Sequence, residues 1–95
     1  MSASPPLHLR LFVSGSSTTS LHARAAVDRL QRDGFVVAES VEIVDVLAEP
    51  ERAAADRVLV TPTLLRVAPA PSRRVLGDLS DLAAVARALG LDAAR

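Results

Sequence analysis

Hydroxyl side chains follow the first apolar segment of this sequence, in the run from Ser14 to Ser20. A serine or threonine acts as a nucleophile only with a base within hydrogen-bond reach, and His8 and His22 are the two imidazoles. The same residue types cap the N-terminus of a helix. We favour capping with a surface position for His22, and we therefore expect no enzyme. Two histidines at this spacing are a poor metal site, and we expect neither a metal nor another cofactor.

Arginine supplies all 11 basic residues, and four arginines gather in the second half of the chain: Arg57, Arg66, Arg73 and Arg74. If the flanking segments form an antiparallel pair, Arg66 shares a face with either Arg73 or Arg74. Such a cluster suits recognition of carboxylates or phosphates, or a protein interface. The alternative is scattered charge that keeps a small protein soluble.

Composition narrows the class of protein. Ninety-five residues predict a single domain over 1–95, with residues 1–6 flexible at its start. The chain has no cysteine, which excludes disulfides and thiolate chemistry. Its formal charge is zero, which argues against nucleic acid or a membrane surface as partner. Since no apolar run is long enough for a membrane span and no signal peptide is visible, we expect a cytoplasmic protein.

Periodicity predicts alternating strands and helices. The expected elements, in chain order, are a strand at 7–13, a helix at 19–33 ended by Gly34, a second strand at 35–38 and 41–46, a short helix at 51–57, strands at 64–67 and 73–76, and a helix ended by Gly90. In the long helix, apolar residues recur at the spacing of one buried face: Ala23, Ala26, Val27 and Leu30. The last two strands are expected to form an antiparallel hairpin around a turn that contains Pro69 and Pro71.

Pro62 stands between two threonines at the entrance of a predicted strand. Because proline cannot donate to a sheet ladder, it belongs at a strand's start, and the Thr61–Pro62 bond is the one we most expect to be cis. In a small α/β domain, a proline at this place is similar to the cis-proline that precedes the third strand of the thioredoxin-like fold. An ordinary junction with a trans proline is the alternative.

Longer motifs lie in the segments 44–47, 56–64 (DRVLVTPTL) and 73–80 (RRVLGDLS), together with the opening Leu9-x-Leu11-Phe12-Val13-x-Gly15. In combination they resemble one family, the KaiB proteins of circadian clocks. These motifs occur in the family's order and extend over about residues 8–91. The resemblance implies an α/β, thioredoxin-like domain, with a four-stranded mixed sheet and three helices in the order βαβαββα.

The resemblance also implies a function without catalysis. KaiB proteins bind the ATPase ring of the kinase KaiC, some also capture KaiA, and the related sensor domain of the kinase SasA is an expected competitor. By this likeness, Arg57, Arg66, Arg73 and Arg74 serve docking. A stand-alone sensor module with another signalling partner, and a serine-dependent enzyme that uses glutathione or another thiol, are the alternatives.

KaiB proteins can also switch between this fold and a tetrameric ground state that differs in the C-terminal half. The resemblance places Pro62, Pro69, Pro71, Ala88 and Gly90 in that half. Ala88 stands where relatives commonly have Gly, and Gly90 where they have Asp. Alanine is about 1 kcal/mol better than glycine inside a helix, and Gly90 makes a good stop after it. We therefore expect a continuous last helix, and a thioredoxin-like monomer rather than the tetramer.

Overall fold

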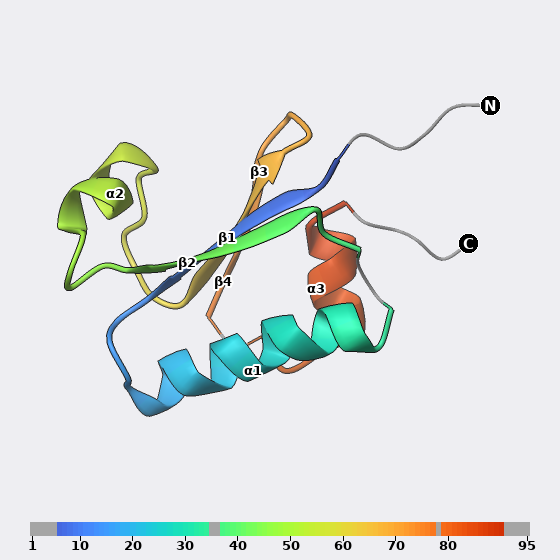
Figure 1. Cartoon of the computed structure of the whole chain (residues 1–95), viewed down its shortest axis with the longest axis horizontal. Helices are drawn as coiled ribbons and strands as arrows, with labels where there is room; N and C mark the ends of the chain where they lie inside the picture. The colour runs from blue at the N-terminus through green and yellow to red at the C-terminus, as the bar shows by residue number, and fades with distance from the viewer. Residues whose placement is uncertain (1–5, 35–36, 78, 91–95) are drawn as a thin grey trace.

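The computed structural model describes residues 6–34, 37–77 and 79–90. In chain order its elements are β1 (His8–Val13), α1 (Thr18–Arg32), β2 (Ser40–Asp45), α2 (Pro50–Ala55), β3 (Thr63–Ala68), β4 (Arg73–Leu76) and α3 (Leu82–Ala88) (Figure 1). This is the βαβαββα order that the sequence predicts. The segment 1–6, expected to be flexible, lies outside the described residues apart from Pro6.

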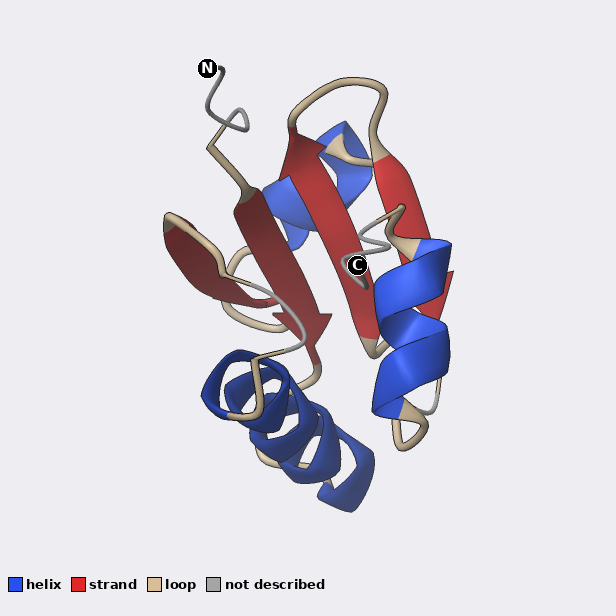
Figure 2. Cartoon of the chain, turned by 90° about the vertical axis from the view of Figure 1, so that its right-hand side faces the viewer, coloured by secondary structure: helices blue, strands red, loops and turns tan. Residues whose placement is uncertain are grey.

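The four strands form one mixed sheet in the order β2-β1-β3-β4. β1 runs parallel to β2 and antiparallel to β3, and β3 and β4 form the predicted antiparallel hairpin. The parallel pair is joined through α1, as a crossover connection requires. α1 and α3 lie on one face of the sheet and α2 on the other (Figure 2).

The larger core lies between the sheet and the helix pair α1 and α3. The predicted stripe of α1 is buried there, together with inward residues of β1 and α3 such as Leu9, Leu11 and Val85. Full burial of one such leucine or valine contributes about 1.5–3 kcal/mol. Aliphatic residues thus supply most of the stability of this face.

A smaller core lies on the second face, under α2. Phe12, Val44 and Leu65 are buried there, and Ala53 of α2 packs against them. α2 is only six residues long, so it covers one end of this face. Leu76 of β4 remains 56% exposed.

Two expectations about the elements need correction. The predicted strand at 35–38 is wrong in the part that can be described, because Val37 and Ala38 precede the strand and Val37 is 87% exposed; Phe35 and Val36 lie outside the described residues. The short helix is Pro50–Ala55 rather than 51–57. None of the described helices is long and apolar enough to cross a membrane.

Candidate functional site

The hairpin separates its arginines between the two faces of the sheet. Arg66 of β3 pairs directly with Arg73 of β4, while Arg74 lies opposite Leu65. Since directly opposed residues share a face, Arg66 and Arg73 lie on the side of α1 and α3, and Arg74 lies on the side of α2. The expectation that one of the two β4 arginines shares a face with Arg66 is confirmed, and the residue is Arg73.

Arg66 is buried, with only 6% of its surface exposed, whereas the docking role expected for it requires an accessible side chain. Its Nη1 donates to the carbonyl oxygen of Leu89 at 2.7 Å, and its Nη2 donates to that of Pro71 at 2.6 Å. Leu89 is the C-cap of α3, and the carbonyls at a helix C-terminus lack partners and attract positive charge. Arg66 thus fastens the end of α3 to the sheet and to the β3–β4 turn.

Gly90 fits closely beneath these arginines. Its φ is +76°, and a Cβ built on it would lie 2.9 Å from Nη1 of Arg66 and 3.2 Å from Nε of Arg73. Gly90 follows the C-cap of α3, and Ala88 is the last residue of the helix. The predicted helix stop is confirmed, and the close approach adds a second reason for glycine there.

Arg74 binds the C-terminal end of α2, as Arg66 binds the C-terminal end of α3. Its guanidinium donates to the carbonyl oxygens of Asp56 and Arg57, at 2.8 and 3.0 Å. Asp56 is the C-cap of α2, and Arg57 follows it with a positive φ of 56°. Two arginines of one hairpin therefore hold the C-terminal ends of two helices on opposite faces of the sheet.

A hollow of about 320 Å³ lies on the second face, between α2 and the hairpin. Arg10, Arg57 and Arg74 line it around an apolar floor that includes Leu65. Asp56 is the acid among its lining residues, and its carboxylate accepts a hydrogen bond from Arg10 at 2.7 Å. The hollow thus carries more positive than negative charge. We refer to it below as the arginine hollow.

Ion pairs fix the position of Arg10. Its Nε donates to Glu42 at 2.8 Å, and Glu42 also accepts from Arg52 at 2.6 Å. These bonds, that of Arg52 first, hold the pKa of Glu42 below its usual range, and the bond to Glu42 raises the pKa of Arg10. Arg57, in contrast, has no ion pair or side-chain hydrogen bond among the residues described, so its charge is available to a partner.

Arg10 is not among the arginines that the sequence predicts to serve docking. A signal was present, since Arg10 is a charged residue between two leucines in a strand, and alternation places it on the face opposite their side chains. Nothing in the sequence placed α2 beside it. The hollow depends on that packing.

The hydroxyls after β1 act as caps and turn contacts. Ser17 caps α1 and accepts from the N–H of Ser20 at 3.3 Å, and the Ser20 hydroxyl accepts from the N–H of Ser14 at 2.9 Å. His8 lies on β1 with Nδ1 2.6 Å from the hydroxyl of Ser40. No group of three or more metal-ligating side chains occurs within residues 6–34, 37–77 and 79–90.

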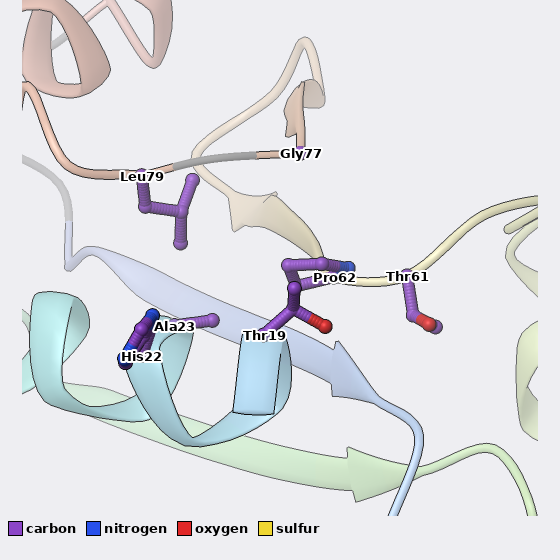
Figure 3. A pocket seen from close by; sticks show the side chains of 7 residues that line it. All are labelled: Thr19, His22, Ala23, Thr61, Pro62, Gly77 and Leu79. Atoms are coloured by element: carbon purple, nitrogen blue, oxygen red, sulfur yellow. The ribbon is translucent and has the colours of Figure 1, made fainter. Parts of the chain in front are cut away.

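The Thr61–Pro62 bond is cis, as predicted, and so are the bonds that precede Pro69 and Pro71. Pro62 is buried at the start of β3. A cavity of about 350 Å³ lies beside it, lined from α1 by Thr19 and His22 and from the opposite side by Leu79 (Figure 3). Asp78, which belongs to the RRVLGDLS motif, lies outside the described residues.

Comparisons with known proteins agree with this architecture. The model of the KaiB domain matches residues 10–91. The circadian clock protein KaiB3 of Synechocystis sp. is 40% identical over 84 residues, which are 88% of this chain and 80% of KaiB3. The oscillator protein KaiB of Prochlorococcus marinus is 36% identical over 92 residues, 97% of this chain and 83% of that protein.

Solved structures show the fold. The N-terminal domain of SasA from Synechococcus elongatus matches with a TM-score of 0.70 and 26% identity, over 88% of this chain and 82% of that domain. Thioredoxin 1 of Thermosipho africanus matches with a TM-score of 0.67 and 14% identity, over 87% of this chain and 90% of that protein. The fold is therefore thioredoxin-like, as predicted, and the chain belongs to the KaiB family.

Proposed function

We propose that this chain is a clock-type regulatory protein that binds the ATPase ring of a KaiC-like kinase. Family membership carries the proposal. The model of the KaiB domain matches residues 10–91, and the relatives that are 36% and 40% identical to this chain are named as circadian clock proteins. The likeness to the N-terminal domain of SasA supports a binding role for this fold. Nothing in the proposal requires catalysis.

The arginine hollow is the docking site in this proposal. Arg57 presents a guanidinium without an acidic partner among the described residues, and Arg10 and Arg74 add positive charge around an apolar floor. A glutamate or aspartate side chain of the ring fits this chemistry, because guanidinium groups bind carboxylates with two parallel hydrogen bonds. Arg66 contributes indirectly by holding α3, and Arg73 lies on the opposite face.

The thioredoxin-like monomer is the resting and binding-competent form in this proposal. Gly90 and Ala88 end α3 without strain, and Arg66 fastens that end. Sedimentation equilibrium at micromolar concentration should therefore give the mass of one chain. A stable tetramer would overturn this part of the proposal and favour the ground state known in the family.

Binding is tested with a purified KaiC-type ATPase ring. The ring is prepared in different nucleotide states, and the wild-type chain should co-elute with it in size-exclusion chromatography in at least one of them. The N-terminal domain of SasA, which shares the fold, should displace it if both use one surface of the ring. Absence of a complex in every nucleotide state would refute the proposed function.

A further inference from the structure

The hydroxyl of Ser72 lies at the arginine hollow without a hydrogen-bond partner. Ser72 directly precedes β4, is exposed and lines the hollow. Most serine and threonine side chains of the described residues make a hydrogen bond, as at Ser17, Ser20 and Thr63. The side chain of Ser72 makes none with the residues that the structure describes. Its Oγ is therefore open to chemistry from solvent.

The main chain fixes the face of the sheet on which this side chain lies. Residues two apart along an extended strand point to the same side, so Ser72 shares the side of Arg74, which faces α2. The carbonyl oxygen of the preceding residue, Pro71, accepts a hydrogen bond from buried Arg66 at 2.6 Å. Ser72 thus lies between a fastened carbonyl group and a paired strand, which hold its side chain at the hollow.

Two guanidinium groups of the hollow, those of Arg57 and Arg74, have no acidic partner among the described residues. The third, that of Arg10, is paired with Asp56 and Glu42. Arg74 donates to two main-chain carbonyl oxygens, which carry no net charge, and a guanidinium has further N–H donors for another acceptor. The hollow therefore carries two positive charges that no acid compensates.

We propose that Ser72 is a phosphorylation site whose phosphate occupies the arginine hollow and blocks docking there. The modifying enzyme is a serine kinase that uses ATP. The bond from Ser72 Oγ to the γ-phosphorus forms as the bond from that phosphorus to the β,γ-bridging oxygen breaks. ADP leaves with the electron pair of the broken bond, and the hydroxyl proton passes to a carboxylate base of the kinase.

A phosphoserine at this position matches the charge of the hollow. The phosphate carries about −1.5 to −2 charge at pH 7 and presents three acceptor oxygens, so it compensates the guanidinium groups of Arg57 and Arg74. Arginine also binds phosphate with two parallel hydrogen bonds. A carboxylate of the ring then meets a filled and nearly neutral hollow, and docking weakens. This blocking role rests on the proposed function, whereas the modification site and its contacts do not.

Incorporation of phosphate tests the modification site itself. The chain is incubated with γ-³²P-labelled ATP and a soluble extract of its native host, and Ser72→Ala is compared with Ser16→Ala. Ser16 is the matched control, because it is also exposed and makes no side-chain hydrogen bond with the described residues, but it does not line the hollow. Label should be lost from Ser72→Ala and kept by Ser16→Ala. An unlabelled wild type, or undiminished label on Ser72→Ala, would overturn the proposal.

The contacts of the phosphate are tested without the ring. Phosphoserine is installed at position 72 by genetic-code expansion, and ³¹P NMR measures the second pKa of its phosphate. Guanidinium groups favour the dianion, so this pKa should lie below the ordinary value of about 6. Arg57→Ala should raise it by about half a unit, and Arg87→Ala, an exposed arginine of α3 outside the hollow, should leave it unchanged. Equal pKa values in these two variants would overturn the proposal.

The blocking role is tested with the KaiC-type ring and three forms of the chain: unmodified, with phosphoserine at position 72, and with phosphoserine at position 16. Phosphate at position 72 should weaken binding about tenfold, and the same charge at position 16 should not. Equal losses at the two positions would show a general effect of charge and would overturn the blocking role. If the unmodified chain does not bind the ring, the proposed function fails, and the incorporation and pKa measurements still decide whether Ser72 is the modification site.

Discussion

Replacing Arg66 with alanine removes a buried guanidinium that donates to Leu89 and Pro71. A hydrogen bond with a charged donor contributes about 1.5–3 kcal/mol, and the variant also leaves the α3 carbonyl at Leu89 without this donor. We therefore expect Arg66→Ala to lower the free energy of unfolding by about 3–5 kcal/mol, similar to the loss of one partner from a buried ion pair. In a domain of this size each kcal/mol lowers the midpoint of thermal unfolding by about 4–8 °C.

Urea unfolding followed by far-UV circular dichroism measures this change, since the chain has no Trp or Tyr to report by fluorescence. Arg66→Met keeps an apolar stem in the same space, so it separates lost hydrogen bonds from lost packing. Arg73→Ala is the matched control. Arg73 faces Arg66 across the hairpin, but it is exposed and its side chain makes no hydrogen bond or ion pair with the described residues. Its replacement should change stability by no more than about 0.5 kcal/mol.

Two results would refute this reasoning. If Arg66→Ala and Arg73→Ala lose the same stability, the two carbonyl bonds do not hold α3 to the sheet. If Arg66→Met is as stable as the wild type, packing of the stem accounts for the effect and the guanidinium contributes nothing. In either case the position of α3 would depend on its apolar contacts alone.

Three further predictions follow from the caps and turns. Arg74→Ala should lower the free energy of unfolding by about 1 kcal/mol. It should also speed amide hydrogen exchange in α2, because Arg74 binds carbonyls at the C-terminal end of that helix. Gly90→Ala should destabilise more than Gly34→Ala in urea unfolding, because both glycines have positive φ but an added Cβ meets Arg66 only at Gly90. Asp45 accepts hydrogen bonds from the N–H groups of Gly15 and Leu47, and the Gly15 bond is the main cause that holds its pKa below the ordinary value of 3.8. The stability that the Asp45 carboxylate contributes is therefore complete above that value and is lost as pH falls through the lower folded pKa. Because Asp45→Asn lacks this contribution, its free energy of unfolding should fall less steeply as the pH is lowered through this range. Equal slopes for the variant and the wild type would contradict this.

The sequence predicted the elements whose signals are local. The apolar stripe of α1, the glycine after α3 and the hairpin with Pro69 and Pro71 in its turn follow from periodicity and turn chemistry. The strand predicted at 35–38 failed where it can be checked, since Val37 is apolar but exposed. Propensity alone does not show whether a run of β-branched residues finds a neighbouring strand.

The candidate site was predicted less well than the fold. The pairing of Arg66 with Arg73 follows from the register of the hairpin, but the burial of Arg66 depends on where α3 ends in space. The part that Arg10 plays likewise depends on the packing of α2 beside β1. Charged residues mark a surface when they are read from the sequence, and the structure shows that two of these arginines bind helix ends instead.

The most direct test of the central claim is the affinity of three proteins for a KaiC-type ATPase ring, measured by biolayer interferometry. The proteins are the wild type, Arg57→Ala in the arginine hollow, and Arg87→Ala, an exposed arginine of α3 that lies outside the hollow. Loss of a charge at an interface reduces affinity and its dependence on salt, so we expect Arg57→Ala to bind about tenfold more weakly and Arg87→Ala to bind like the wild type. Equal affinity of all three proteins would contradict the assignment of the arginine hollow, and failure of the wild type to bind would contradict the proposed function itself.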